Sequence, residues 1–183
     1  EFEEKEGKLK KEAHLDGQTE DGKKVLIYSN VGSVEDVKNA VKYYIDGIGL
    51  FRSEFLYMEN DHFPTEDEQF EAYKQAVEIC KGEVIIRTLD IGGDKELSYY
   101  EFLKEENPFL GFRAIRISLE LKDMFKEQLR ALLRASAFGY VSIMYPMIIS
   151  IEELLEANAI LEECKKELDD KNIAYNKDIK VGM

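Results

Sequence analysis

Tryptophan is absent from the 183 residues, and proline, cysteine and histidine are scarce, with three, two and two copies. Cationic side chains are also in the minority, since 25 lysines and arginines against 38 aspartates and glutamates give a formal net charge of −13. Nucleic-acid-binding proteins need a basic surface to displace the counterions of the phosphates, so this charge argues against that class. No apolar run approaches the roughly 20 residues that span a bilayer, so we expect no membrane insertion.

The cysteines and the amino-terminal segment indicate the compartment. Cys80 and Cys164 lie far apart in helix-like segments, and they fit neither a disulfide framework nor a metal site. Residues 1–22 are polar and charged, without an apolar period, and show no signal peptide. We predict that this segment is a tail or linker and that the protein is reduced and cytoplasmic.

From residue 23 to residue 183, strand-like apolar runs alternate with amphipathic helical segments. Strands are expected at residues 24–30, 47–52, 83–90, 141–147 and 178–183. Helices are expected after the N-cap residues Ser33 and Thr65, and at residues 108–139 and 150–170. Apolar strands that alternate with helices indicate a parallel sheet covered by helices.

The number of residues in this alternation of strands and helices indicates which α/β fold is present. A closed (β/α)8 TIM barrel takes about 250 residues, and roughly half of one is present here. We predict a truncated TIM barrel of about five parallel strands and four helices within residues 23–183, and we expect the chain to be a fragment of a longer protein. A complete five-stranded doubly wound domain has the same pattern and is the alternative.

Charged side chains gather where the second and third expected strands end, at the edge of α/β sheets that carries the chemistry. Arg52 and Arg87 lie at these ends, and Arg113 follows in the next loop. One arginine at a strand end most often makes a surface ion pair. Three at one edge predict an anion clamp, because guanidinium binds phosphate or carboxylate through two hydrogen bonds. The candidate supporting residues are Glu54, Asp90, Gly92, Gly93, Lys95 and Asn107.

Two neighbouring features have alternative interpretations. Gly92 and Gly93 form either an ordinary tight turn or a turn that brings the backbone close to a ligand. Arg116 lies three residues after Arg113 on an expected helix, so both could share one face. For Arg116 we expect an ion pair rather than ligand contact.

Several catalytic and cofactor motifs are missing. The sequence has no P-loop, and GIGLFR lacks the third glycine of a dinucleotide-binding fingerprint. No cluster of His, Cys and carboxylates has the spacing of a zinc site. His14 and His62 have neither a neighbouring nucleophile nor a second ligand, so we expect no catalytic role for them.

A set of longer stretches matches one known family in order and spacing. They are GIGLFRSEFLYM, DEQFEAYKQAV, VIIRTLDIGGDKEL, KEENPFLGFRAIRISLE, LRALLRASAFG and IMYPMIIS. Together they cover nearly the whole chain from Lys24 on, and they resemble enzyme I of the bacterial phosphoenolpyruvate-dependent sugar phosphotransferase system. The stretch RTLDIGGDK differs from the related pyruvate phosphate dikinases and phosphoenolpyruvate (PEP) synthases.

The resemblance implies a transferase with PEP as phosphoryl donor. Enzyme I phosphorylates a histidine of its own amino-terminal domain and passes the group to the histidine-containing phosphocarrier protein for sugar uptake. Its barrel domain binds PEP and Mg²⁺ and forms a homodimer. The family's arginines that match Arg52, Arg87 and Arg113 hold the phosphate of PEP. Asp90 and Lys95 are expected to orient this clamp through ion pairs.

Other parts of the family's machinery have no counterpart among these residues. The phosphorylated histidine belongs to the amino-terminal domain, and the Mg²⁺ ligands and the proton-donating cysteine follow the fifth strand. We therefore expect this chain to hold part of the phosphate clamp, no metal site and no transfer activity. A fragment of a dikinase or synthase, and a stand-alone anion-binding regulatory module, are the alternatives.

Overall fold

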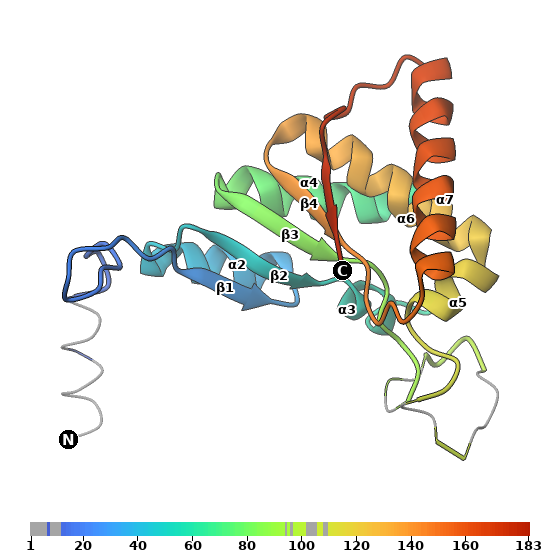
Figure 1. Cartoon of the computed structure of the whole chain (residues 1–183), viewed down its shortest axis with the longest axis horizontal. Helices are drawn as coiled ribbons and strands as arrows, with labels where there is room; N and C mark the ends of the chain where they lie inside the picture. Colours follow the sequence, from blue (N-terminus) through green and yellow to red (C-terminus); the bar gives the residue numbers. More distant parts are fainter. Residues whose placement is uncertain (1–6, 8–11, 94, 96, 102–105, 108–109) are drawn as a thin grey trace.

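A parallel five-stranded sheet forms the centre of the chain (Figure 1). The computed structural model describes residues 7, 12–93, 95, 97–101, 106–107 and 110–183. The strands are β1 (Tyr28–Val31), β2 (Gly47–Arg52), β3 (Glu83–Arg87), β4 (Val141–Met144) and β5 (Lys180–Gly182). The helices are α2 (Val34–Ala40), α3 (Glu54–Met58), α4 (Glu66–Cys80), α5 (Ile115–Glu120), α6 (Lys122–Ala135) and α7 (Ile151–Asp170). Short 3₁₀ turns follow α2 and α6, at η1 (Val41–Tyr43) and η2 (Ser136–Phe138).

The order of the strands decides between the two expected folds. Each strand pairs in parallel with the next strand along the chain, in the order β1-β2-β3-β4-β5. A doubly wound sheet reverses its order at a switch point, and this sheet has no reversal. The doubly wound alternative is therefore wrong. The sequential order is that of a partial barrel, with five strands that do not close on themselves.

The helices cover one face of the sheet, as in the outer layer of a barrel. Contacts run from α2 to α4, from α4 to α6 and from α6 to α7, and α2, α4 and α6 lie behind the strands in Figure 1. The alternation in β3 follows from this arrangement, since Val84 and Ile86 are fully buried toward the helices. Ile85 and Arg87 alternate with them and are half-buried, so we place Arg87 on the opposite, open face.

The predicted helix starts are confirmed by their caps. Ser33 accepts a hydrogen bond from the Asp36 amide, and the Asp36 carboxylate accepts one from the Ser33 amide. Thr65 and Glu68 form the same reciprocal pair at the start of α4. Such capping boxes satisfy backbone N–H groups that have no partner within the helix. The expected helix at 108–139 begins later, at Ile115, and is divided into α5 and α6.

Several strand boundaries differ from expectation, including the end of the fourth strand, at Met144 rather than residue 147, and the span of the fifth, Lys180–Gly182 rather than 178–183. The first strand begins at Tyr28 rather than at residue 24, because Lys24 instead pairs antiparallel with Gln18 in a turn. The third strand ends at Arg87, before the segment that continues to residue 90. Gly139, the last residue of the helix expected at 108–139, lies in extended backbone with a φ of 163°. A Cβ there would lie 2.5 Å from Val77 Cγ1, so close packing explains this glycine.

The cysteines are helical and form no disulfide, as the sequence predicts. Cys80 lies half-buried at the end of α4, and Cys164 is buried in α7. Burial raises the pKa of the Cys164 thiol to about 12 and also raises the pKa of Cys80. Neither thiol therefore has the thiolate character of a nucleophile. In the part of the chain that the structure describes, no helix is long and apolar enough to cross a membrane.

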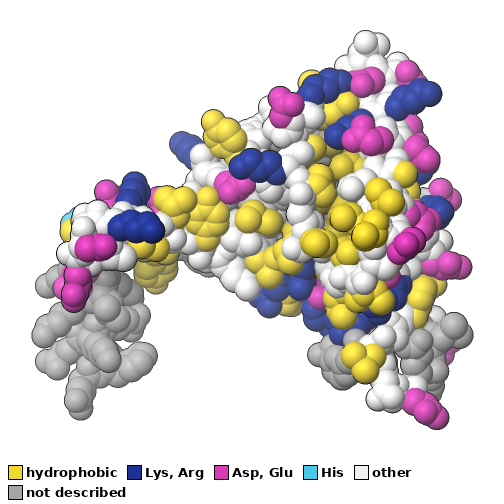
Figure 2. Space-filling model, in the orientation of Figure 1, with side chains coloured by type: hydrophobic (Ala, Val, Ile, Leu, Met, Phe, Trp, Pro, Cys, Tyr) yellow, Lys and Arg dark blue, Asp and Glu magenta, His cyan; other side chains and the backbone are white. Residues whose placement is uncertain are grey.

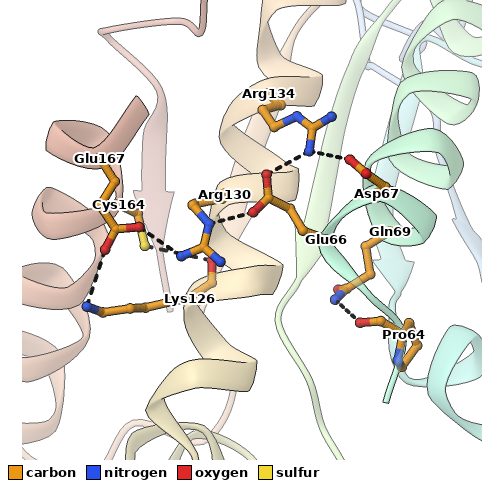
Figure 3. A network of polar contacts seen from close by, with 9 residues as sticks. All are labelled: Pro64, Glu66, Asp67, Gln69, Lys126, Arg130, Arg134, Cys164 and Glu167. Carbon is orange, nitrogen blue, oxygen red and sulfur yellow. Dashed lines mark hydrogen bonds and ion pairs between the residues drawn. The ribbon is translucent and has the colours of Figure 1, made fainter. Parts of the chain in front are cut away.

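A network of ion pairs joins α4, α6 and α7 on the helical side (Figure 3). Arg130 lies between Glu66, at 2.5 Å, and Glu167, at 2.9 Å. Arg134 contacts Glu66 at 2.6 Å and Asp67 at 2.7 Å. Each arginine therefore contacts carboxylates from another helix. We call these ion pairs between α4, α6 and α7 the brace.

His62 lies in the loop before α4, and its ring is flanked by two carboxylates. Nδ1 is 2.8 Å from Asp61 Oδ1, and Nε2 is 3.2 Å from Glu68 Oε2. The hydrogen bonds to Asp61 and Glu68 raise the pKa of His62.

A raised pKa in the folded state makes the stability depend on pH. The contribution of His62 is fully present below its unfolded pKa of about 6.5, and it is lost as the pH rises through the higher folded value. We expect the His62→Asn variant to lose stability relative to wild type at pH 5.5 and to match it more closely at pH 8.5. Urea unfolding at both pH values measures this difference. An equal difference at both would contradict the prediction.

Candidate anion-binding site at the ends of β2 and β3

Arg52 and Arg87 are neighbours across the sheet. They end β2 and β3, and their Cα atoms are paired in register. In the orientation of Figure 1, Figure 2 shows Lys and Arg side chains gathered beside the carboxyl ends of the strands. The juxtaposition of these two arginines therefore follows from the parallel register of the sheet, as the sequence predicts.

Two buried carboxylates hold the cations of this edge together. Glu54 is the first residue of α3 and is fully buried, and its Oε1 lies 2.6 Å from Arg87 Nη2 and 2.9 Å from Lys95 Nζ. Asp90 contacts Arg87 Nη1 through Oδ2 at 3.0 Å and Arg113 Nη2 through Oδ1, also at 3.0 Å. Lys95 Nζ lies 3.7 Å from Asp90 Oδ2. Asp90 thus joins an arginine of the sheet to an arginine of the following loop.

Arg52 differs from the other arginines in its partner. Its guanidinium carbon lies 4.8 Å from the centre of the Phe55 ring, a cation–π contact. Its Nε is buried without a hydrogen-bond partner, and among the described residues it makes no ion pair. This guanidinium is therefore placed at the sheet edge with hydrogen-bonding capacity that the surrounding residues do not use.

The charges of this group, which we call the arginine cluster, do not balance. It comprises Arg52, Arg87, Lys95, Arg113, Glu54 and Asp90. Among the described residues, four cations and two carboxylates give this group a formal charge of 4 − 2 = +2, in a chain with a net charge of −13. An excess of oriented guanidiniums in a partly buried position is suited to binding an anion.

The glycine turn packs against the segment that carries Arg113. Gly92 and Gly93 have φ values of +103° and +71°, which favour glycine. A Cβ on Gly92 would lie 2.6 Å from Arg113 Cβ, and the Ala114 amide donates to the Ile91 carbonyl at 2.9 Å. The turn is therefore tight, and its close approach is to Arg113. Close approach of the backbone to a ligand stays a prediction. Asp94, which follows, lies outside the described residues.

A small apolar cluster, separate from the main core, supports the loop between β3 and α5. Its buried members are Tyr57, Leu89, Ile91, Leu97, Ile117 and Met124. The Tyr99 hydroxyl donates to the Tyr57 carbonyl at 2.8 Å and ties the loop to α3. The described part of the loop, with Leu89, Ile91 and Leu97, thus packs against α3, α5 and α6.

Two other candidate residues lie apart from the arginine cluster. Asn107 is exposed, and its carbonyl accepts a hydrogen bond from the Leu110 amide. No contact joins Asn107 to the three arginines within the described ranges. Arg116 lies 3.4 Å from Glu153 and donates to the Gly111 carbonyl at 2.5 Å, so its expected ion pair is confirmed.

Sequence reasoning missed two buried polar residues behind the cluster. Ser53 donates to the Arg87 carbonyl at 2.6 Å, and Gln128 of α6 donates to the Ser53 hydroxyl at 3.1 Å. Both side chains are fully buried. The available signal was a glutamine within an apolar stripe of α6, next to Leu129 and one turn from Phe125 and Leu132. A buried polar side chain needs a hydrogen-bond partner and points to a specific network.

The family of the chain is shown by comparison with known proteins. A family model described as PEP-utilising enzyme, PEP-binding domain, matches residues 6–183. The chain belongs to this family. The arginine cluster therefore lies within a PEP-binding domain, at the edge of its sheet where the sequence predicts an anion site.

Several relatives of this PEP-binding domain bear the name phosphoenolpyruvate-protein phosphotransferase. The protein from Mycoplasma capricolum is 57% identical over 175 residues, which is 96% of this chain and 30% of the relative. The Haemophilus influenzae protein is 49% identical over 181 residues, 98% of this chain and 32% of the relative. The Bacillus sp. (strain S) protein is 54% identical over 166 residues, which is 90% of this chain and 29% of the relative. The chain spans about a third of the length of these relatives.

Proposed function

We propose that this chain is the part of a phosphoenolpyruvate–protein phosphotransferase that holds the phosphate of PEP, with Arg52, Arg87 and Arg113 as the phosphate clamp. The observation that carries the proposal is the group of guanidiniums at one sheet edge, two of them joined through Asp90. The family match and the names of the relatives support PEP as the ligand. Those names also favour a phosphotransferase over a dikinase, a synthase or a stand-alone module.

The clamp would act by position and charge. In phosphoryl transfer, negative charge spreads over the equatorial oxygens of the phosphoryl group, and fixed cations stabilise it. Glu54 and Asp90 repel an anion, so their role here is to orient the side chains of Arg87, Lys95 and Arg113. A guanidinium that a carboxylate holds on one side is already ordered before the ligand binds. Its remaining N–H groups can therefore bind phosphate without a further loss of side-chain entropy.

The same proposal assigns partners to the longer enzyme. The phosphoryl group would pass from PEP to a histidine of another domain and then to the histidine-containing phosphocarrier protein, in the service of sugar uptake. A second copy of the enzyme, joined through the barrel domain, and a cytoplasmic location complete this proposal. The two free cysteines support a reducing compartment.

Mg²⁺ is the cofactor that the resemblance implies for the whole enzyme. The carboxylates of the arginine cluster do not fit it, because Glu54 Oε1 and both Asp90 oxygens already contact cations and the remaining oxygen, Glu54 Oε2, would be a single ligand. Mg²⁺ requires oxygen ligands in near-octahedral geometry. Within the described ranges, no group of three or more His, Cys, Asp or Glu side chains could hold a metal. We therefore assign the Mg²⁺ ligands to residues outside this chain.

A titration of the ¹⁵N-labelled chain with PEP, with and without Mg²⁺, tests the proposal. We expect saturable amide shifts around Arg52, Arg87 and Gly92 that are the same with and without the metal. Pyruvate, which has the carboxylate but not the phosphate, is the matched control and should leave these amides unshifted. A well-dispersed spectrum without PEP-dependent shifts, or equal shifts with pyruvate, would contradict a phosphate clamp in this chain.

A further inference from the structure

A chain of buried hydrogen bonds connects helix α6 to the Ser53 side chain, which follows β2, and to the backbone at the end of β3. Gln128 Nε2 donates to the Ser53 hydroxyl at 3.1 Å and to the Tyr73 hydroxyl at 3.1 Å. Gln128 Oε1 accepts from the Leu89 amide at 2.9 Å. Ser53, Tyr73, Leu89 and Gln128 are all fully buried. This network lies beneath the site rather than in it.

Only one assignment of donors and acceptors satisfies the groups of this network. Both N–H groups of the Gln128 amide are donated, so the Ser53 and Tyr73 hydroxyls must direct their own protons elsewhere. Ser53 donates to the Arg87 carbonyl at 2.6 Å, and Tyr73 donates to Gln69 Oε1 at 3.1 Å. Because each buried group is satisfied, the network holds a single arrangement.

We propose that Gln128 is a positioning residue for the phosphate clamp and that it sets the spacing of Arg52 and Arg87. Ser53 directly follows Arg52, and the Leu89 amide lies between Arg87 and Asp90. Gln128 contacts both segments, so one side chain of the helical layer aligns the ends of two strands. The inference rests on the proposed function for its effect on PEP binding, but its geometric part concerns the unliganded chain alone.

Three variants separate positioning from general stability. Gln128→Leu removes every hydrogen bond of the amide at similar volume. Ser53→Ala removes the link to the Arg87 carbonyl and the acceptor of one Gln128 N–H, and it leaves the bond between Gln128 and the Leu89 amide. It serves if Gln128→Leu fails to fold. Ser136→Ala is the matched control, because Ser136 is also a buried serine, donating to the Leu133 carbonyl and accepting from the Asn176 amide. It lies in η2, and none of these contacts involves the arginine cluster.

Each variant is measured for PEP affinity by titration, for stability by urea unfolding, and for the Nε–Hε resonances of Arg52 and Arg87 without ligand. We expect Gln128→Leu and Ser53→Ala to weaken PEP binding about tenfold, as is typical when the residues that orient a ligand-binding group are lost. Both should shift the two arginine resonances. Ser136→Ala should lose stability while its affinity stays within about twofold of wild type.

The outcomes distinguish this inference from the proposed function. Unshifted arginine resonances in both Gln128→Leu and Ser53→Ala would overturn the positioning role, as would an affinity that follows stability alone across the three variants. If wild type does not bind PEP, the proposed function fails, and the resonances still decide the role of Gln128. Shifts of the arginine resonances in Gln128→Leu and Ser53→Ala, but not in Ser136→Ala, would then support the positioning role of Gln128.

Discussion

Replacing Arg87 by methionine is expected to weaken PEP binding by about 100-fold and to lower the stability of the chain by about 1–3 kcal/mol. The guanidinium lies at the end of β3 and contacts both Glu54 and Asp90. Methionine keeps much of the apolar stem and removes the charge. Two losses follow from this change. The phosphate loses a charged donor, and the fully buried Glu54 is left, among the described residues, with Lys95 as its cationic partner.

Arg130 provides a matched control for this experiment. Its side chain is 16% exposed, as is that of Arg87, and it also lies between two carboxylates, Glu66 and Glu167. It belongs to the brace between α4, α6 and α7 and not to the sheet edge (Figure 3). We expect Arg130→Met to reduce stability by a similar amount and to leave PEP affinity unchanged.

Isothermal titration with PEP and urea unfolding measure both quantities for the two variants. Near-normal PEP affinity in Arg87→Met would remove Arg87 from the clamp. An equal loss of affinity in Arg130→Met would show that both arginines act through the stability of the fold, because no ion pair joins Arg130 to the arginine cluster among the described residues. Only separation of affinity from stability supports the assignment.

The contrast between the two arginine groups gives a physical criterion for the site. In the brace, the cations Lys126, Arg130 and Arg134 meet the carboxylates Glu66, Asp67, Glu163 and Glu167. There the carboxylates outnumber the cations, whereas the arginine cluster has four cations and two carboxylates. A group that only stabilises the fold has no need of surplus buried charge, because desolvated charge is costly unless it is paired. Among the described residues, this difference in charge supports the proposed phosphate clamp.

The sheet edge could be predicted because it depends on regular structure. The carboxyl ends of parallel strands share one edge, so Arg52 and Arg87 could be assigned to the same edge once β2 and β3 were recognised, and the structure shows that they are neighbours. The sequential order of the strands needed the structure, since a barrel and a doubly wound sheet have the same alternation. The start of β1 was wrong, because Val25, Leu26 and Ile27 have the composition of a strand but are exposed.

The loop between β3 and α5 could be predicted only in part. The charges of Asp90 and Lys95 indicated ion pairs, and both make them. The network of Ser53 and Gln128 joins residues 75 positions apart, and no local pattern specifies such a pairing. Asn107 was grouped with the site from its place in a motif, but its contacts depend on loop packing that sequence spacing does not determine.

Gly92→Ala is expected to destabilise the chain by at least about 2 kcal/mol, which is large for the addition of one methyl group. Gly92 has a φ of +103°, where a residue with a side chain is strained by about 1–3 kcal/mol. The new Cβ would also lie 2.6 Å from Arg113 Cβ and 3.1 Å from Arg113 Cα, so the backbone must move. Because Asp90 holds Arg113 to Arg87, that movement displaces a member of the clamp.

Gly182→Ala is the control for this substitution, because a Cβ at Gly182 would meet nothing within 4 Å. We expect its free energy of unfolding and its PEP affinity to stay near those of wild type, whereas Gly92→Ala loses both. Urea unfolding and PEP titration measure the pair. If Gly92→Ala lost stability but kept full affinity, Arg113 would not depend on the turn for its position. Unchanged stability would mean that the turn can open away from Arg113, and that the close approach at Gly92 is not what places this arginine.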